Sequence, residues 1–352
     1  METFMKKMNL FWGGVMVLFA FAACSTGDWY DDSFMPTTSS STTTSVTTQS
    51  NDDNSKTTST ADNVTTGVSS DGDVTSFTVA LNKNAITESV NVNADDDDYI
   101  ENTTFGKTIT ITFSKTGAAT VSGDDTGIVT INGNDVTATN NTENVIKYVL
   151  TGETNDGYFK LYSSKKQAIV LNGVSITNPD GAAINNQSKK RTFIVLNDGT
   201  KNYLTDGTNY SDATDNEDMK ACFFSEGQLI FSGSGYLEVD ANCKAGIRSD
   251  DYVRTMPKSN IFVDASSGNG IRGNDAVIVT GGVINVNVTG TADKGLSTDG
   301  EIRIDGGRTT ILTSGGYEYD EDDKDYSACS GIKADSVVTI NGGEVNILST
   351  GT

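Results

Sequence analysis

The 352-residue sequence contains no histidine and few basic residues. The absence of imidazole excludes His-based nucleophilic catalysis and His-ligated zinc. The 25 lysines and arginines are outnumbered by 47 aspartates and glutamates, which gives a formal net charge of −22. A chain with this charge repels nucleic acid and anionic membrane surfaces, so neither is expected as a direct partner.

Cysteine is also scarce, and its spacing is uninformative about metals. Apart from Cys24, the chain has Cys222, Cys243 and Cys329, with no CxxC pair, so a zinc ribbon is not expected. In an oxidising compartment two of these three can pair, and Cys222 with Cys243 is the first choice. The alternative, that they are small buried hydrophobic residues, stays open.

Residues 1–24 have the features of a bacterial lipoprotein signal peptide. Two lysines precede an apolar stretch at 10–21 that is too short to span a membrane. The alanine pair before Cys24 resembles a lipobox, which implies cleavage before Cys24 and acylation of its thiol; an ordinary secretory signal is the alternative. The acidic residues that follow resemble surface-export signals of Bacteroidota lipoproteins. We therefore expect an outer-membrane, cell-surface location, with the lipid as the membrane contact.

Two further regions precede the repeat. Residues 25–73 are rich in serine, threonine and asparagine and are expected to form a flexible stalk, because they carry too little apolar surface to offset chain entropy. Residues 74–150 contain short alternating segments split by polar turns, which is typical of strands. We expect this β region to cap the exposed first unit of the repeat.

From about residue 183 to the end, the sequence repeats with a period of 24–25 residues. Aliphatic or aromatic anchors follow one another at intervals of 39, 24, 24, 25 and 36 residues, and the two long intervals carry insertions. The anchors are Ile184, Phe223, Ile247, Ile271, Leu296 and Ile332.

Further apolar columns accompany the anchors at fixed offsets. Apolar residues recur six and eight positions after most anchors, then come glycine pairs such as Gly281-Gly282, then a second alternating pair. Period-2 alternation interrupted by glycine indicates strands, and repetition at this length indicates a stacked solenoid. The sequence therefore predicts an all-β, right-handed parallel β-helix over 151–352. No cap is recognisable before Thr352, so we expect the natural sequence to continue beyond it.

A polar column lies three residues after the anchors and suggests a metal site. Equivalent positions of neighbouring units lie about 4.8 Å apart, where stacked carboxylates repel. Ca²⁺ binds six to eight oxygen ligands in flexible geometry and would compensate this repulsion. The alternative is a solvated corner whose carboxylates pair with neighbouring basic residues. The candidate ligands, with two flanking aspartates, are Glu226, Asp250, Asp251, Asn274, Asp275, Asp299 and Asp335.

A basic row lies one residue after the anchors, at Arg248, Arg272 and Lys333. In an extended segment these side chains point to the same side as the polar column. They are candidates to bind the carboxylates of an acidic sugar chain. Surface salt bridging of little energetic weight is an equally open alternative.

Two insertions are the other candidate sites. Residues 317–325 combine an acidic run with Tyr317 and Tyr319, and Tyr326 follows. Tyrosine rings on a solenoid loop can stack on sugar rings, although a solvated charge run is the alternative. The second insertion, 197–220, ends in an acidic stretch. The run Asp95–Asp98 lacks the spacing of an EF-hand loop.

The ordered pieces together resemble a known family. LNGVSITNPDGAAI, KACFFSEGQLIFSGSG, AGIRSDD, NGIRGNDAVIVTGG and SGIKADSVVTINGG look like the carbohydrate-binding β-helix family first described from a clostridial cellulose degrader. The resemblance covers about 75–352. It implies a calcium-containing right-handed β-helix with a pectate-lyase-like fold that binds cellulose or pectin-like polysaccharide.

Three functions remain open on the sequence. The first is a non-catalytic, lipid-anchored carbohydrate-binding protein assisted by Ca²⁺. The second is a structural adhesin or surface spacer, since β-helices also serve as spacers. The third is a Ca²⁺-dependent polysaccharide lyase, which would need an arginine or lysine base; no catalytic signature stands out. The first is our prediction.

Overall fold

The computed structural model describes residues 95–211, 217–321 and 324–351, together with β1 (Ser45–Thr47), β2 (Val64–Val68) and β3 (Val74–Val79). Within these residues, helical structure is limited to two 3-10 turns, η1 (Asp96–Asp98) and η2 (Ile100–Asn102). None of the described helices has the length and hydropathy needed to cross a bilayer. The predicted all-β class is confirmed.

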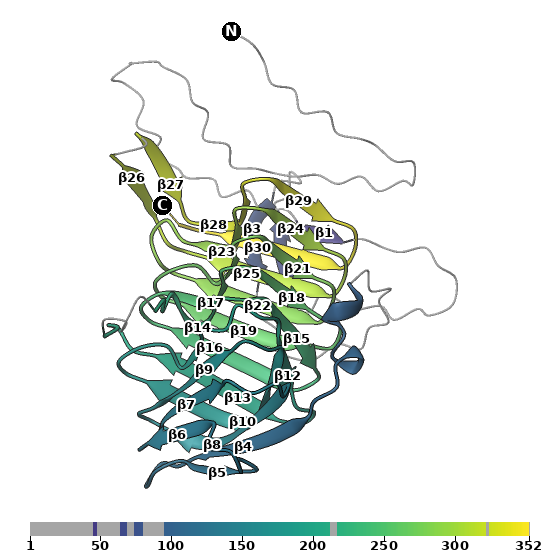
Figure 1. Ribbon diagram of the computed structural model, residues 1–352. Coiled ribbons are helices and arrows are strands. Elements are labelled where there is room, and N and C mark those ends of the chain that lie inside the picture. Colours follow the sequence, from purple (N-terminus) through teal and green to yellow (C-terminus); the bar gives the residue numbers. More distant parts are fainter. Residues whose placement is uncertain are drawn as a thin grey trace.

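Most strands belong to two long sheets of 17 and nine strands, in which strands far apart in sequence lie side by side (Figure 1). The 17-stranded sheet has two columns of parallel strands. The first column contains β4 (Lys107–Phe113), β8 (Ile146–Thr154), β10 (Gln167–Asn178), β12 (Thr192–Leu196), β15 (Leu229–Gly233), β18 (Tyr252–Thr255), β21 (Ala276–Val279), β24 (Glu301–Ile304) and β29 (Val337–Ile340).

The second column of this sheet starts from the latter half of β10. It contains β13 (Lys201–Asp206), β16 (Tyr236–Ala241), β19 (Asn260–Ala265), β22 (Val283–Val288), β25 (Arg308–Thr313) and β30 (Glu344–Ser349). The nine-stranded sheet contains β6 (Val129–Asn132), β7 (Asp135–Asn140), β9 (Tyr158–Ser163), β11 (Ile184–Asn186), β14 (Ala221–Ser225), β17 (Ala245–Ser249), β20 (Ile271–Gly273), β23 (Lys294–Thr298) and β28 (Ser330–Ala334).

The register of the nine-stranded sheet matches the period of the sequence. Ile184 pairs with Phe223, Phe223 with Ile247, and Ile247 with Ile271. The column continues through Ile271–Leu296 and Leu296–Ile332. One sequence period is therefore one step from a strand to its parallel neighbour, and the predicted anchor column is confirmed.

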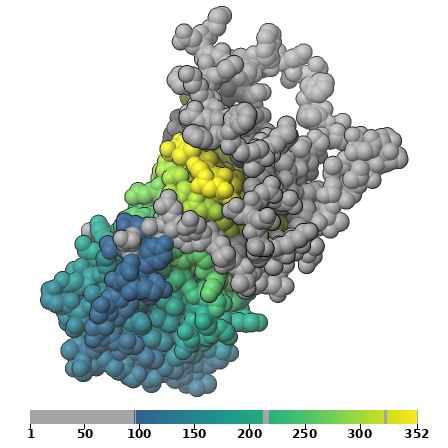
Figure 2. All heavy atoms as spheres, turned by 90° about the vertical axis from the view of Figure 1, so that its right-hand side faces the viewer, coloured from purple at the N-terminus to yellow at the C-terminus, as the bar shows by residue number. Residues whose placement is uncertain are grey.

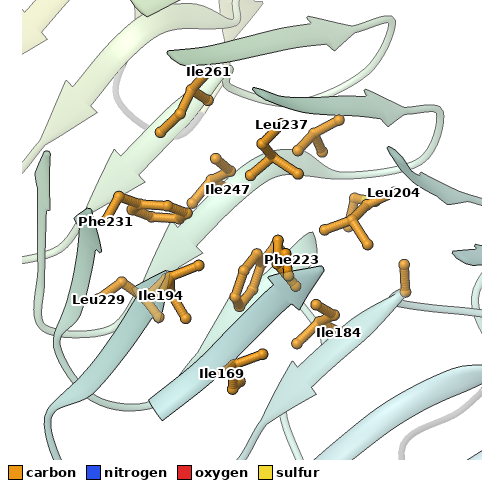
Figure 3. Packing of buried hydrophobic residues seen from close by; sticks show 14 of the residues in the cluster. Ile169, Ile184, Ile194, Leu204, Phe223, Leu229, Phe231, Leu237, Ile247 and Ile261 are labelled. Carbon is orange, nitrogen blue, oxygen red and sulfur yellow. The ribbon is translucent and has the colours of Figure 1, made fainter. Parts of the chain in front are cut away.

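The anchors and the other apolar columns meet between the sheets (Figure 3). Phe223, Phe231 and Leu237 are fully buried there, and the rings of Phe223 and Phe231 make an edge contact with centroids 5.9 Å apart. Alternate residues of each strand point inward, as period-2 patterning requires. An exception among the predicted inward residues is Val338, which is 39% exposed in the last described repeat.

Glycines serve two purposes in the later repeats. The second glycine of each pair has a positive φ, +91° at Gly282, +80° at Gly307 and +86° at Gly343, as the predicted turn requires. The glycine before each of the last four anchors has a packing role that the sequence pattern did not reveal. A Cβ on Gly246 would lie 2.2 Å from Val263 Cγ1, and a Cβ on Gly270 the same distance from Val286 Cγ1. These glycines therefore let the two sheets approach closely at that corner.

Parallel pairing begins earlier than the repeat is visible in the sequence. β4 pairs parallel with β8, and β7 pairs parallel with β9, inside the region 74–150 that we predicted as a cap. The two sheets then end in antiparallel strands, β5 (Thr120–Ser122) on β4 and β6 on β7. Near the last repeat, β1 pairs antiparallel with β30.

The cysteines in the described residues form no disulfide. Cys222 and Cys329 are buried, and Cys243 is partly buried. Burial raises the pKa of the Cys222 thiol well above its ordinary value, which keeps it protonated and unreactive. Of the two interpretations, the structure favours small buried hydrophobic residues. Cys24 and most of the predicted stalk lie outside the described residues.

Candidate functional site

The polar column lies at the C-terminal ends of the strands of the nine-stranded sheet. Backbone hydrogen bonds connect successive repeats along this column. Asp250 N donates to Ser225 O, Asn274 N to Ser249 O, and Asp299 N to Asn274 O. Asp250 and Asn274 side chains also meet, at 3.4 Å between Nδ2 and Oδ1. The predicted ladder of oxygen ligands is thus stacked along one corner of the molecule.

The basic row stands beside this column in exact register, Arg248 opposite Arg272 and Ser297 opposite Lys333. Arg272 Nη2 donates to both oxygens of Asp299 at 2.7 Å. Lys333 pairs with Asp335 at 2.7 Å. The aspartate side chain of each pair is at least half exposed. Each ion pair therefore contributes well under about 1 kcal/mol to stability.

One part of the column gathers several carboxylates. Carboxylate oxygens of Asp218, Glu226 and Asp250 lie within 4.8 Å of one another. Lys220 lies among them, with Nζ 2.6 Å from an oxygen of Asp218 and 2.6 Å from one of Asp250. Burial, and then the neighbouring carboxylates of Asp250 and Asp218, raise the pKa of Glu226. We call these three carboxylates the acidic corner.

The acidic corner has the oxygen ligands that a hard cation prefers. Three carboxylates offer up to six oxygens, which is within the range that Ca²⁺ uses. The backbone carbonyl of Asp218 lies beside them and accepts a bond from Gln187 Nε2 at 2.7 Å. The Lys220 ammonium already neutralises part of this negative charge. The corner therefore fits either a bound metal cation or Lys220 as its counterion.

Two predicted ligands, Asp251 and Asp275, each directly follow a residue of the polar column. Asp251 accepts a hydrogen bond from Gln228 and one from the backbone of Tyr252. Burial, followed by the charge of Asp275, raises the pKa of Asp251. Asp275 N in turn donates to Asp251 O. This pair forms its own stack, on the turn between the two sheets.

The insertion after β25 forms an antiparallel hairpin that projects from the stack (Figure 1). Its strands are β26 (Tyr317–Asp320) and β27 (Asp325–Ala328), and every residue in them is exposed. The ring centroid of Tyr326 is 5.3 Å from that of Tyr317 and 4.9 Å from that of Tyr319. Tyr317 is 60% exposed, Tyr319 41% and Tyr326 58%. We call them the tyrosine platform.

The two faces of the hairpin differ in chemistry. Alternation along β26 separates Tyr317 and Tyr319 from Glu318 and Asp320. A hollow of about 290 Å³ on this hairpin is lined by Glu318, Tyr319, Asp320, Glu321 and Ser327. Exposed rings with carboxylates beside them can stack on the apolar face of a sugar and accept hydrogen bonds from its hydroxyls.

A buried lysine fixes the base of the hairpin. Lys294, at 7% exposure, donates to the carbonyls of Ala292 and Ala328, the latter at 2.6 Å, and to Ser327 Oγ at 3.1 Å. Burial lowers the pKa of its ammonium. It joins the repeat that precedes the hairpin to the hairpin's second strand.

Replacing Lys294 with methionine should cost about 1–3 kcal/mol of unfolding free energy, because the carbonyls of Ala292 and Ala328 and the Ser327 hydroxyl lose a buried donor. Urea unfolding measures this change. Lys189→Met is the matched control, since its side chain is 82% exposed, and it should change stability by less than about 0.5 kcal/mol. Equal effects of the two substitutions would show that Lys294 does not fix the hairpin.

Some features of the site were not identified from the sequence. Asp218 belongs to the acidic stretch of the candidate insertion 197–220, but its approach to the polar column, together with Lys220, depends on a loop path that the repeat does not encode. Lys294 stands where other repeats have an uncharged residue before the glycine, Ala245, Asn269 or Ser330, and that departure was the available signal. Asp212 and Asp215, also in the acidic stretch, lie outside the described residues.

The profile of a family described as "Carbohydrate-binding domain-containing protein" matches residues 132–292 and 286–352. A protein of that description from Acetivibrio thermocellus is 35% identical over 122 residues, which is 34% of this chain. The aligned stretch spans 42% of that relative.

A solved structure has a similar fold. It is described as the polysaccharide lyase-like protein from C. thermocellum, in a gadolinium derivative. The likeness has a TM-score of 0.52 and 25% sequence identity, and covers 70% of this chain and 97% of that one.

Proposed function

The chain belongs to the family of carbohydrate-binding domain-containing proteins, and we propose that it is a non-catalytic, cell-surface lipoprotein that binds plant-type polysaccharide with the help of Ca²⁺. The observation that carries this proposal is the tyrosine platform, because it presents three exposed rings on a hairpin that adds nothing to the core. Stacking on such rings is a general means of binding sugars.

We infer that the scaffold is a right-handed parallel β-helix. Each repeat adds one strand to each of three parallel columns, and the repeats stack in register. The similarity to a polysaccharide lyase-like protein supports this inference. In such a scaffold, insertions at a corner project from a rigid stack, which is where specific contacts are expected.

At the polar column, acidic polysaccharide is the ligand class that needs the cation. A chain of net charge −22 repels a polyuronate unless cations or basic side chains of the protein lie between the two. The acidic corner supplies oxygen ligands for Ca²⁺, and the basic row of Arg248, Arg272 and Lys333 lies beside it for a sugar carboxylate. Cellulose, which is neutral, would bind through the tyrosine platform without the cation or the basic row.

Addition of Ca²⁺ should raise the melting temperature by about 5–10 °C at a hundredfold excess over Kd, and EDTA should reverse the rise. The Asp250→Asn variant should lose most of this shift, because one of the three carboxylates becomes neutral. Differential scanning calorimetry measures it. The matched control is Asp180→Asn, which removes one charge from an exposed residue outside the corner.

The Lys220→Met variant distinguishes a bound Ca²⁺ from Lys220 as the counterion of the acidic corner. If Ca²⁺ binds there, removal of the competing ammonium enlarges the Ca²⁺-induced shift. If Lys220 is the resident counterion and no cation binds, neither the wild type nor the variant responds to Ca²⁺. The latter result would remove calcium from the proposal.

The lipid anchor and the outer-membrane location rest on the leader sequence alone. Cys24 would carry the lipid, and residues 25–73 would hold the folded part away from the membrane. Metabolic labelling with a fatty-acid analogue tests this directly. Label should be lost in a Cys24→Ser variant, and an unlabelled wild type would remove the anchor from the proposal.

Binding, cleavage and passive spacing can be distinguished by one set of assays. The protein should be retained on pectin or cellulose, with retention on pectin reduced by chelator. Incubation with polygalacturonate and Ca²⁺ should give no ultraviolet absorbance from unsaturated uronides, because Arg248, Arg272 and Lys333 are all paired with polar partners rather than poised as a base. Absorbance would favour a lyase, and absence of retention on a broad glycan panel would favour a spacer.

A further inference from the structure

A segment N-terminal to the repeats crosses the outside of the 17-stranded sheet. Residues 95–105, which we call the strap, contain η1 and η2 and lie beside β12, β15 and β18 (Figure 1). In Figure 2 the blue segment that includes the strap runs over the teal and green surface of the later strands. The strap then leads into β4, which belongs to the same sheet.

Two aspartates of the strap are held by a basic cluster on that sheet. Asp98 is about 1% exposed, with Arg191 Nε 3.0 Å from one carboxylate oxygen and Arg254 Nε 2.9 Å from the other. The hydroxyl of Tyr252 donates to the same carboxylate. Asp97 lies 2.8 Å from Lys166 Nζ and 3.0 Å from Arg191 Nη1.

The basic cluster is partly removed from water. Arg254 is 6% exposed and Arg191 is 13% exposed. Burial lowers the pKa of Arg254, while for Arg191 burial is outweighed by the hydrogen bond with Tyr252 and by both carboxylates. A guanidinium with this little water around it is strongly destabilised unless an anion accompanies it. The cluster is therefore a carboxylate-binding arrangement, filled in this state by the strap.

A groove continues from the strap along the same face. It has a volume of about 450 Å³, and its wall on one side is Ile100 and Glu101 of the strap. Residues of β8, β10, β12 and β15, with Asn197 directly after β12, form the rest. They are Lys147, Val149, Val170, Asn172, Val195, Asn197, Ser232 and Gly233. Asn197 Nδ2 donates to Asn172 Oδ1 at 2.7 Å, so amides of neighbouring repeats line up as a polar edge above a valine floor.

We propose that this face is a second glycan-binding groove, in which Arg191, Arg254 and Tyr252 receive the carboxylate of a uronate residue and the strap's Asp98 occupies that place in the free protein. Neighbouring sugars of the chain lie on the valine floor, with hydroxyls at Asn172 and Asn197. The proposal rests on the proposed function, because glycan is chosen over acidic peptide on the family's carbohydrate-binding description. The groove lies on a different sheet from the polar column and works without a metal.

Displacement of the strap by a ligand predicts a gain of binding when Asp98 is neutralised. The Asp98→Asn variant should bind a tetragalacturonate about tenfold more tightly than the wild type, since the competing internal carboxylate is weakened. Isothermal titration in EDTA measures this gain and keeps the acidic corner free of Ca²⁺. The matched control is Asp95→Asn, which removes the same charge from the strap at an exposed residue outside the basic cluster, and it should leave the affinity unchanged.

The gain must depend on the arginines. Adding Arg254→Met to the Asp98→Asn variant should return the affinity to the wild-type value or below. Unchanged affinity in Asp98→Asn would overturn the proposal and leave the strap as a structural clasp. Equal gain for poly-L-glutamate would overturn the glycan assignment, because the groove would then accept polyanions in general.

The wild-type protein gives an independent readout that requires no substitution. Saturating tetragalacturonate should increase hydrogen exchange of the strap amides, for example Asp98 N and Asn102 N, which are bonded within the strap in the free state. Unchanged exchange at saturation would contradict displacement. A wild type retained on cellulose through the platform, with no strap response, would overturn the inference alone; absence of binding to any glycan would overturn the proposed function.

Discussion

Replacing Phe223 with alanine is expected to lower the free energy of unfolding by about 3–5 kcal/mol. The side chain is fully buried in the anchor column, between Ile184 and Ile247 in the register. It also makes an edge contact with Phe231. Truncation therefore removes buried apolar surface and leaves a cavity that neighbours in a stacked sheet cannot fill. Urea unfolding followed by circular dichroism measures the loss.

Val337→Ala is the control for this prediction. Val337 belongs to β29 and is 47% exposed, so its truncation should change stability by less than about 0.5 kcal/mol. A small effect of Phe223→Ala, similar to that of Val337→Ala, would mean that the anchor column is not the core of the stack. The assignment of one sequence period to one strand step would then fail.

The second large effect concerns the tyrosine platform. Removing Tyr326 should weaken binding of a neutral cellulose derivative about tenfold, and removing Tyr319 and Tyr326 together should abolish its detectable retention, because an exposed aromatic anchor commonly contributes about 1–2 kcal/mol or more. Tyr326 is the central ring, in contact with both others. Affinity electrophoresis in gels containing a soluble, neutral cellulose derivative gives the change.

Two controls make this result specific to the rings. Tyr326→Phe keeps the stacking surface and should retain most of the affinity, which separates ring stacking from hydrogen bonding by the hydroxyl. Tyr203→Ala removes a 38% exposed tyrosine that packs on Tyr236 away from the hairpin, and it should have no effect on binding. If Tyr203→Ala weakened binding as much as Tyr326→Ala, the platform would not be the binding site.

The sequence was sufficient for the class of fold and for much of its register. The anchors recur with period 24–25 because each must fill the same place in successive repeats, so periodicity translates directly into pairs such as Phe223 with Ile247. The positive φ of Gly282 was predictable for a similar reason, since a turn recurs at that point in each repeat. Local patterning decides these features.

Features that depend on long-range contacts were not predictable. Asp98 meets Tyr252, 154 positions along the chain, and nothing periodic connects the strap to the repeat. Lys220 enters the acidic corner from an insertion, so its pairing with Asp250 depends on the path of a loop. The sequence showed that the basic row lies one residue after the anchors, but it did not show whether these side chains form ion pairs. The structure shows that Arg272 and Lys333 already have carboxylate partners.

The most direct test of the central claim is an NMR titration of the wild-type protein, labelled with ¹³C in its tyrosine rings, with pectin and cellulose oligosaccharides. Single Tyr→Phe variants would assign the resonances of Tyr317, Tyr319 and Tyr326. The account predicts saturable shifts of these three rings with at least one oligosaccharide, while the ring of buried Tyr148 stays unchanged. Binding without any shift of the three hairpin rings would contradict the account.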